Sequence, residues 1–181
     1  SGVDRTDINR QYYQLFAGVE HAALVDAGRD WYLQYRAQPT AFVTASIGAI
    51  EEHRAAGDRI VLVSGSCRPV LEPLAQDVGA DLVLCTEPLV GDDGRLTGAV
   101  VRPMIGDNKA DAVGSTISAL GFEAADCFCY GDHASDLGML SQVGHPRMVG
   151  ADPVLTEYAQ RLGWPVLPAT AGPLAESRVP R

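Results

Sequence analysis

The chain has 181 residues, of which 46% are hydrophobic, and its 23 acidic and 14 basic residues give a net charge of −9. This length allows one domain with a substantial core, and the acidic balance excludes a general nucleic-acid binder, which needs a basic face. No run of roughly 18 apolar residues occurs, so no membrane span is expected. The polar start predicts no secretory signal. The four cysteines show no Cys-x-x-Cys spacing, which predicts reduced thiols in a cytoplasmic protein and no zinc site.

The first third of the sequence predicts helices with no strand between them. Apolar residues at helical spacing indicate two helices over residues 7–38. A third helix is expected to carry Phe42 and Val43 on its apolar side and to end at Gly57. The aromatic residues of this segment are expected to pack in its core rather than form a substrate cage; they are Tyr12, Tyr13, Trp31 and Tyr32.

From residue 58 onward, short strands alternate with helices. The strands are rich in β-branched or apolar residues and are bounded by turn residues. A β-hairpin, with a glycine- and aspartate-rich tip between its arms, interrupts the alternation. The expected strands are 59–64, 82–85, 126–130, 147–149 and 164–167, and the expected hairpin arms are 87–90 and 96–101.

This alternation predicts an α/β fold with a three-layer, Rossmann-like parallel sheet. Residues 1–56 are interpreted as a helical cap segment, incomplete at its N-terminus, and residues 57–168 as the α/β core with its β-hairpin insertion. The stretch 169–181 is rich in proline and alanine and shows little periodicity, so it is expected to be a loose tail.

Two aspartates four residues apart follow the strand at 126–130. The strand delivers Asp132 to the carboxyl end of the sheet, where an acid faces a crevice rather than a core. Asp136 lies in the opening turn of the next helix. Two carboxylates there suit Mg²⁺, which takes oxygen ligands and keeps some of its waters. The alternative is that both aspartates only cap the helix.

Two other segments bring candidate phosphate-binding groups to the same edge. Ser64 and Gly65 lie at the carboxyl end of the first strand and precede a helix, so they offer a hydroxyl and backbone N–H groups to an anion; the alternative is a simple turn with the serine as helix cap. Lys109 is the only lysine of the chain and begins a helix, where the dipole disfavours a cation unless an anion lies nearby. Arg68 and His133 are candidate substrate contacts, with a solvated helix residue and a loop residue as the alternatives.

In this order and placement the segments resemble the haloacid dehalogenase-like phosphohydrolases, in particular their phosphoserine-phosphatase-like branch. The resemblance covers roughly residues 59 to 167. Ser64 falls on the second motif of that family, Lys109 on the third, and Asp132 with Asp136 on the fourth. Each motif is short, but their joint order, spacing and position after strands make the fold prediction specific.

The resemblance implies a phosphatase acting on a small phosphorylated metabolite. In this family an aspartate attacks the phosphomonoester to form an aspartyl-phosphate, a second aspartate two residues on acts as acid and base, and Mg²⁺ shields the charges. Carried over, Asp132 binds Mg²⁺ and Asp136 supports it directly or through water. Ser64 and the Gly65 N–H hold phosphoryl oxygens, and Lys109 holds phosphate and nucleophile together.

The first motif of the family, an apolar strand ending in Asp-x-Asp, has no counterpart in these 181 residues. One hypothesis is that the nucleophile and its central strand lie upstream of this sequence. Without that strand, Val61, Val63, Cys127 and Cys129 lack a neighbour to pack against. The alternative hypothesis is a catalytically inactive protein that binds a phosphorylated ligand or a partner. A third is a phosphotransferase, because an aspartyl-phosphate can pass to an alcohol other than water.

Overall fold

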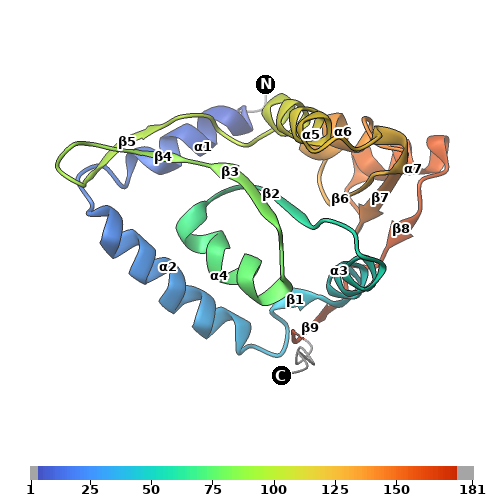
Figure 1. Ribbon diagram of the computed structural model, residues 1–181, viewed down its shortest axis with the longest axis horizontal. Helices are drawn as coiled ribbons and strands as arrows, with labels where there is room; N and C mark the ends of the chain where they lie inside the picture. Colours follow the sequence, from blue (N-terminus) through green and yellow to red (C-terminus); the bar gives the residue numbers. More distant parts are fainter. Residues whose placement is uncertain (1–3, 175–181) are drawn as a thin grey trace.

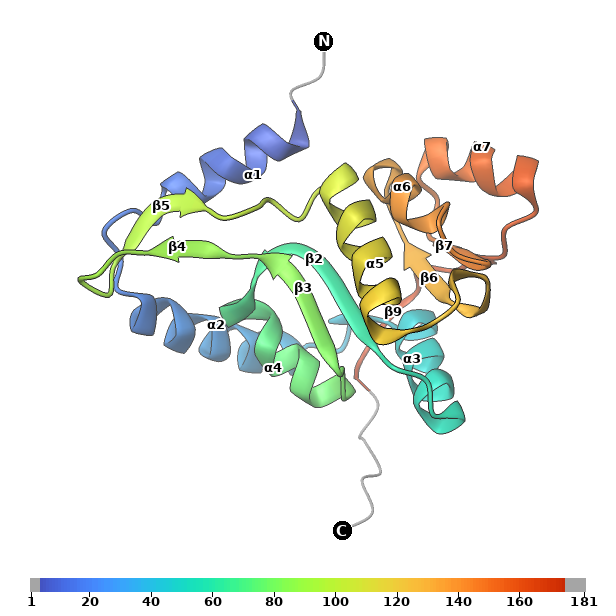
Figure 2. The same cartoon turned by 45° about the horizontal axis from the view of Figure 1, so that its top comes forward.

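The computed structural model describes residues 4–174 and confirms the predicted α/β fold (Figures 1 and 2). The helices, including the short 3₁₀ turns η1 and η2, are α1 (Arg5–Gln14), α2 (His21–Arg36), α3 (Thr44–Ala56), α4 (Arg68–Val78), α5 (Asp107–Leu120), η1 (Ala124–Asp126), η2 (Ala134–Asp136), α6 (Leu137–Leu140) and α7 (Pro153–Leu162). The strands are β1 (Phe42–Val43), β2 (Val61–Cys67), β3 (Leu82–Thr86), β4 (Pro88–Val90), β5 (Leu96–Val100), β6 (Phe128–Gly131), β7 (His145–Val149), β8 (Val166–Leu167) and β9 (Ala171–Gly172).

The parallel strands form two separate half-sheets. In one, β2 pairs with β3, and in the other β6, β7 and β8 pair in that order. Within residues 4–174 no strand pairs with both halves, so β2 and β6 each keep one unpaired backbone edge. The parallel core expected from the sequence is therefore present but divided into two parts. Figure 2 shows both parts, with β2 and β3 in one and β6, β7 and β8 in the other.

Helix boundaries follow the local signals of the sequence. Helix α4 has a proline in its first turn and ends at Gly79, whose φ of 66° is left-handed. Helix α7 begins where the Asp152 carboxylate accepts a hydrogen bond from the Leu155 N–H, 2.9 Å away. These terminations explain why the helix positions after residue 58 were predictable.

Three apolar clusters hold the chain together. The first joins α1, α2, the end of β2 and β5, with Tyr13 and Leu96 both 2% exposed at its centre. The second packs α4 on β3, and the third packs α6 and α7 on β7, where Leu140, Met148 and Leu155 have no solvent exposure. The first cluster matters most for function, because it fixes α1 and α2 over the end of β2.

The predicted hairpin is confirmed as β4 and β5, which pair antiparallel. Figure 1 shows it extending beside α1. Hydrogen bonds connect its tip to the loop between α1 and α2. The Arg95 guanidinium donates to the Gly18 carbonyl at 2.8 Å and to the Glu20 carboxylate at 2.7 Å. The hairpin therefore contacts the loop that joins the first two helices.

Three local predictions were wrong. Phe42 and Val43 form the strand β1 rather than the start of a helix, because they pair antiparallel with Ala171 and Gly172 of β9. The same pairing orders part of the segment expected to be a loose tail; residues 175–181 lie outside the described residues. The segment 64–66 belongs to strand β2, not to a turn, with an irregular register against β3.

Helix α3 lies beside the half-sheet of β6, β7 and β8. The His53 ring joins it to β6 through a hydrogen bond between Nε2 and the Tyr130 hydroxyl, 2.9 Å apart. The boundary at residue 56 between cap and core stays a prediction, as do the other two segment boundaries. Helices α1 and α2, by contrast, pack against the end of β2, and α2 lies beside α4 (Figure 1).

Candidate active site

A cavity of about 680 Å³ lies among α1, α2, the end of β2, the start of α5 and the loop after β6. Its wall includes Ser64, Gly65, Lys109, Asp132 and Asp136. These residues come from three distant parts of the chain. His133 lines the same cavity, so six of the seven site residues expected from the sequence meet in one place.

The backbone at Gly65 is held by two side chains of α1. Asn9 donates from Nδ2 to the Gly65 carbonyl at 2.9 Å, and the Tyr13 hydroxyl donates to the same oxygen at 3.2 Å. Burial raises the pKa of Tyr13, which keeps its hydroxyl a neutral donor. The Ser66 N–H donates to the Ser64 hydroxyl oxygen at 3.1 Å, so the Ser64 hydroxyl proton stays available to an anion.

Lys109 and Asp136 form the most enclosed ion pair of the cavity. Lys109 Nζ lies 2.7 Å from Asp136 Oδ1, and the two side chains are 12% and 4% exposed. This contact explains how a cation is tolerated at the N-terminus of α5, where the helix dipole opposes it. It also fixes the ammonium at the cavity wall in a direction set by a buried carboxylate.

The remaining aspartate and the histidine differ in their surroundings. Asp132 is exposed at the end of β6. His133 Nδ1 accepts a hydrogen bond from the Ser135 N–H at 2.9 Å, which caps the 3₁₀ turn η2. In the neutral ring the proton is therefore on Nε2. His133 thus shapes the loop that separates the two carboxylates.

The donor set fits a magnesium ion in part. Asp132 and Asp136 are hard oxygen donors that line one cavity, as Mg²⁺ requires when it binds through one or two carboxylates, waters and substrate phosphate. Within residues 4–174 no group of three or more acidic, histidine or cysteine side chains is arranged as a complete metal cage. A full ligand set therefore needs groups beyond these two carboxylates.

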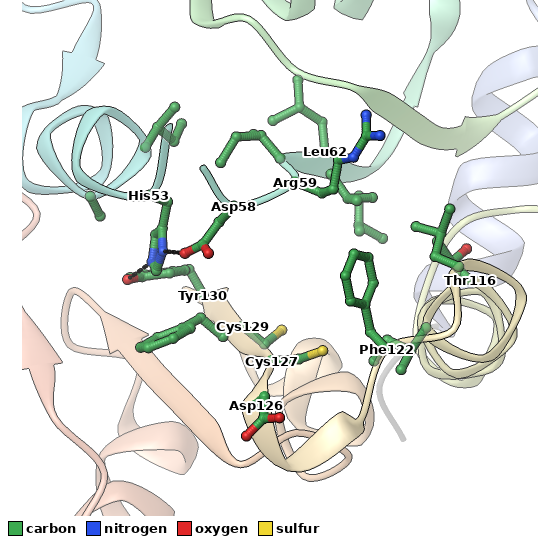
Figure 3. A pocket seen from close by; sticks show the side chains of 18 of the residues that line it. His53, Asp58, Arg59, Leu62, Thr116, Phe122, Asp126, Cys127, Cys129 and Tyr130 are labelled. Atoms are coloured by element: carbon green, nitrogen blue, oxygen red, sulfur yellow. Dashed lines mark hydrogen bonds and ion pairs between the residues drawn. The ribbon is translucent and has the colours of Figure 1, made fainter. Parts of the chain in front are cut away.

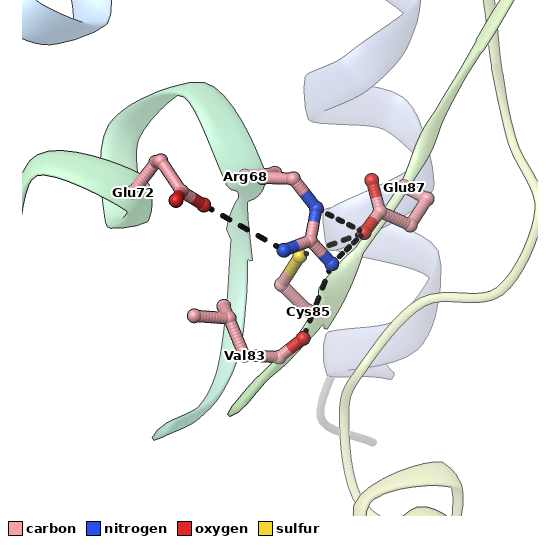
Figure 4. A network of polar contacts seen from close by, with 5 residues as sticks. All are labelled: Arg68, Glu72, Val83, Cys85 and Glu87. Atoms are coloured by element: carbon pink, nitrogen blue, oxygen red, sulfur yellow. Dashed lines mark hydrogen bonds and ion pairs between the residues drawn. The ribbon is translucent and has the colours of Figure 1, made fainter. Parts of the chain in front are cut away.

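Arg68 is not among the residues that line the cavity, unlike the other six expected site residues. Its guanidinium donates to Glu87 Oε1 from Nη2 at 2.8 Å and from Nε at 3.1 Å, and to the Val83 carbonyl at 3.2 Å (Figure 4). Glu72, one helical turn along α4, lies 3.7 Å away. Arg68 ties α4 to β3 and its neighbouring carboxylate, a role that helical position alone did not reveal.

The cavity wall contributed by α1 and α2 was not predicted from the sequence. Tyr13 and Tyr32 are buried as expected, at 2% and 3% exposure, but Tyr12 and Trp31 are about half exposed and line the cavity. Arg5 and Asn9 complete this wall. The signal that would have found it is the helical spacing of Arg5, Asn9 and Tyr12–Tyr13, which places them on one side of α1.

Gly131 is expected to be essential for the position of Asp136. A Cβ atom at Gly131 would lie 2.9 Å from the Asp136 Cβ and 3.1 Å from a Leu140 methyl group. Gly131→Ala should therefore lower the free energy of unfolding by about 2 kcal/mol and displace the carboxylate, which urea denaturation and phosphate-binding calorimetry would measure. The control is Gly48→Ala, where a Cβ meets nothing within 4 Å; equal behaviour of the two variants would contradict this role.

A second cavity, of about 530 Å³, separates the two half-sheets (Figure 3). The β2 residues Val61, Leu62 and Val63 form one side, and the β6 residues Cys129 and Tyr130 form the other. Helices α3 and α5 supply the remaining walls. We call this cavity the inter-sheet groove. It is mainly apolar, and it lies along the unpaired edges of two parallel strands.

A polar chain closes one part of the inter-sheet groove. His53 Nδ1 lies 2.7 Å from an Asp58 carboxylate oxygen, and its Nε2 lies 2.9 Å from the Tyr130 hydroxyl (Figure 3). On the opposite part of the groove, the sulfur atoms of Cys127 and Cys129 and the ring of Phe122 project into the space. The apolar part is therefore continuous with β6, whose end carries Asp132.

The cysteines are expected to alkylate slowly at neutral pH. Burial raises the pKa of Cys85 and of Cys129 to about 12, assisted at Cys85 by Glu87 and at Cys129 by Asp136. Because the thiolate is the reactive form, labelling by iodoacetamide should accelerate about tenfold per pH unit between pH 8 and 11. Mass spectrometry of each cysteine peptide measures this, and rapid labelling of Cys85 below pH 8 would contradict it.

Comparison with known proteins identifies the family of this fold and site. The sequence model of the haloacid dehalogenase-like hydrolases matches residues 2–141. The chain therefore belongs to the haloacid dehalogenase-like hydrolases, as its motif order predicted. The segments Ser64–Gly65, Lys109 and Asp132–Asp136 all fall inside the matched range.

Individual relatives agree with this assignment. The chain is 42% identical over 118 residues to the inhibition of morphological differentiation protein of Streptomyces azureus. This match covers 65% of the chain and 43% of that protein. It is 33% identical over 142 residues to a probable phosphatase of Mycobacterium tuberculosis, covering 78% of the chain and 49% of the relative. The chain thus spans about half the length of these curated relatives.

A solved structure shares the fold. A substrate-bound phosphoserine phosphatase superposes with a TM-score of 0.68 at 22% identity, and the match covers 91% of the chain and 72% of the phosphatase. This likeness shows that the chain shares the fold of that phosphatase. In the part of the chain that the structure describes, no helix is both long and apolar enough to cross a membrane.

Proposed function

We propose that this chain is part of a Mg²⁺-dependent phosphatase for small phosphomonoesters, and that its nucleophilic aspartate lies on a strand upstream of these residues. The observation that carries the proposal is the convergence of Ser64, Lys109, Asp132 and Asp136 on one cavity. A hydroxyl donor, an oriented ammonium and two carboxylates are the groups that a phosphoryl site needs.

The upstream strand is assigned to the inter-sheet groove. Unpaired strand edges are a liability in a folded protein, and a groove between two parallel edges offers backbone pairing on both sides. Val61, Val63 and Cys129 offer such a strand an apolar contact surface. A strand running parallel to β2 and β6 would end at the same edge as Ser64 and Asp132. It would so deliver a carboxylate to the cavity that Ser64, Lys109, Asp132 and Asp136 line, which we call the phosphate cavity.

Each residue of the cavity has a defined task. The Ser64 hydroxyl and the Gly65 N–H bind phosphoryl oxygens. The Lys109 ammonium, held by Asp136, compensates the negative charge of phosphate and carboxylate at close approach. Asp132 and Asp136 would hold Mg²⁺, which supplies further positive charge when bound. Buried Tyr13 and Asn9 keep the Gly65 peptide in place through their hydrogen bonds.

The proposed reaction has two steps, formation and hydrolysis of an aspartyl-phosphate. A carboxylate oxygen of the upstream aspartate forms a bond to phosphorus while the bond from phosphorus to the ester oxygen breaks, and a second carboxylic acid gives its proton to the leaving alkoxide. Water then attacks the aspartyl-phosphate, loses a proton to that second carboxylate and releases inorganic phosphate. The first aspartate is thereby restored as a carboxylate.

The partner is a small phosphorylated metabolite, because the cavity of about 680 Å³ suits a small molecule. We also place the protein in the cytoplasm, since all four cysteines are free thiols.

The test measures Mg²⁺-dependent phosphate release from p-nitrophenyl phosphate and a panel of small phosphomonoesters. It compares the 181-residue chain with the product of its complete reading frame. We expect activity in the longer product alone. Silence in both products, with phosphate still bound, would contradict catalysis and favour a phospho-ligand binding protein. Transfer to an added alcohol faster than to water would instead identify a phosphotransferase.

A further inference from the structure

The wall that α1 and α2 add to the phosphate cavity has an unusual chemistry for a site that binds a charged metabolite. Its members are Arg5, Asn9, Tyr12, Tyr13 and Trp31. Tyr12 is 53% exposed and Trp31 is 50% exposed, and they come from different helices. Two large aromatic side chains that are half exposed at one cavity present ring surface to whatever occupies it.

Both rings are held in place from behind. Trp31 stacks on Tyr35, with ring centroids 5.0 Å apart and an interplanar angle of 17°. Tyr12 packs edge-on against Tyr13 at 5.3 Å and against Phe16 at 5.2 Å. Tyr13 is in turn anchored by its hydrogen bond to the Gly65 carbonyl. The rings therefore keep a fixed relation to the phosphate end of the cavity, and little side-chain freedom is lost when a ligand contacts them.

The charges of the wall also select the ligand. Arg5 is its cation, and it reaches across to the Ser135 hydroxyl at 3.5 Å. Among the described residues, the lining contributed by α1 and α2 contains no carboxylate. The two carboxylates of the cavity come from the segment after β6, and Asp136 is already paired with Lys109. An ammonium group on the alcohol part of a substrate would therefore meet a guanidinium of like charge and no acid on this wall.

We propose that Tyr12 and Trp31 are specificity-determining residues for a phosphomonoester whose alcohol part carries a flat aromatic group and no free amino group. This inference rests on the proposed function, since it takes the Ser64 and Lys109 end of the cavity as the phosphate site. It sets the ligand apart from a small phosphorylated amino acid, which combines an ammonium with no ring.

The test uses phosphonates, because their carbon–phosphorus bond resists hydrolysis and binding can be measured on a competent enzyme. Isothermal titration calorimetry compares benzylphosphonate, methylphosphonate, 2-aminoethylphosphonate and inorganic phosphate on the product of the complete reading frame with Mg²⁺. We expect benzylphosphonate to bind about tenfold tighter than methylphosphonate, from ring stacking. 2-Aminoethylphosphonate is expected to bind no tighter than methylphosphonate.

Two variants test whether Trp31 causes the preference for benzylphosphonate. Trp31→Leu keeps an apolar side chain but removes the ring, and it should reduce the preference for benzylphosphonate over methylphosphonate to about threefold or less. Tyr158→Leu is the matched control, because its ring packs under Arg161 on α7 and not at the cavity; its preference should be unchanged.

The outcomes separate this inference from the proposed function. Equal binding of benzylphosphonate and methylphosphonate would overturn the aromatic specificity and leave the phosphate site standing. Tighter binding of 2-aminoethylphosphonate than of benzylphosphonate would do the same. Failure of every phosphonate and of inorganic phosphate to bind would overturn both the phosphate site and the specificity built on it.

Discussion

In the product of the complete reading frame, replacing Lys109 with methionine should abolish the proposed phosphatase activity and lower the free energy of unfolding at pH 7 by about 3 kcal/mol. The methionine fills a similar volume but leaves the Asp136 carboxylate, 4% exposed, without its partner at 2.7 Å. A buried unpaired charge is costly because the protein interior cannot replace the water that the charge has lost. Urea denaturation of the variant and of the parent protein, together with phosphate release, measures the two effects.

A double variant separates stability from activity. Lys109→Met combined with Asp136→Asn removes both charges, so no unpaired ion remains, and most of the lost stability should return. Activity should not return, because the ammonium that compensates phosphate charge is still missing. If the double variant were as unstable as the single one, Lys109 would act through packing rather than through its pairing with Asp136.

The site was predictable from the sequence where its residues follow strands or begin helices. Ser64 and Asp132 were placed by strand ends, and Lys109 by the start of a helix whose dipole needed an explanation. Strand ends and helix starts depend on neighbouring residues in the chain, so they can be predicted from the sequence. The sequence did not reveal that Lys109 pairs with Asp136, because that contact joins α5 to the loop after β6 and depends on how the two pack.

Residues on amphipathic helices were harder to place. Tyr12 and Tyr13 are adjacent, yet one is half exposed at the cavity and the other is buried under the Gly65 carbonyl. Arg68 begins a helix as Lys109 does, but it pairs with Glu87 of the neighbouring strand segment instead of the cavity. In each case the direction of the side chain depends on a partner that is distant in sequence.

The same limit explains the errors at the two ends of the core. Phe42 and Val43 continue a helical pattern, but the hydrogen bond from the Thr44 N–H to the Thr170 carbonyl, 3.0 Å long, belongs to a strand pairing across 126 residues of chain. A two-residue strand offers no periodicity to detect. The absence of an Asp-x-Asp motif from these residues, by contrast, was evident from the sequence, and within residues 4–174 the parallel strands form two separate half-sheets.

A charge in the inter-sheet groove should distinguish a filled groove from an open one. Val63 lines the groove from β2 and is only partly buried in the 181-residue chain. Val63→Arg should therefore cost little in that chain, on the order of 1 kcal/mol or less, since the guanidinium reaches solvent through the open groove. In the product of the complete reading frame, where we assign a strand to the groove, the same arginine would be buried without a partner and should cost about 4 kcal/mol.

The difference between the two proteins is the informative quantity, because any local effect of arginine on β2 is common to both. Val166→Arg is the matched control: Val166 lies on β8, is 55% exposed and is distant from the groove, so its cost should be small and equal in both proteins. Urea midpoints of the four variants and two parents give the comparison. A small and equal cost for Val63→Arg in both would mean that no strand fills the groove, and the nucleophile would then have to reach the cavity by another route.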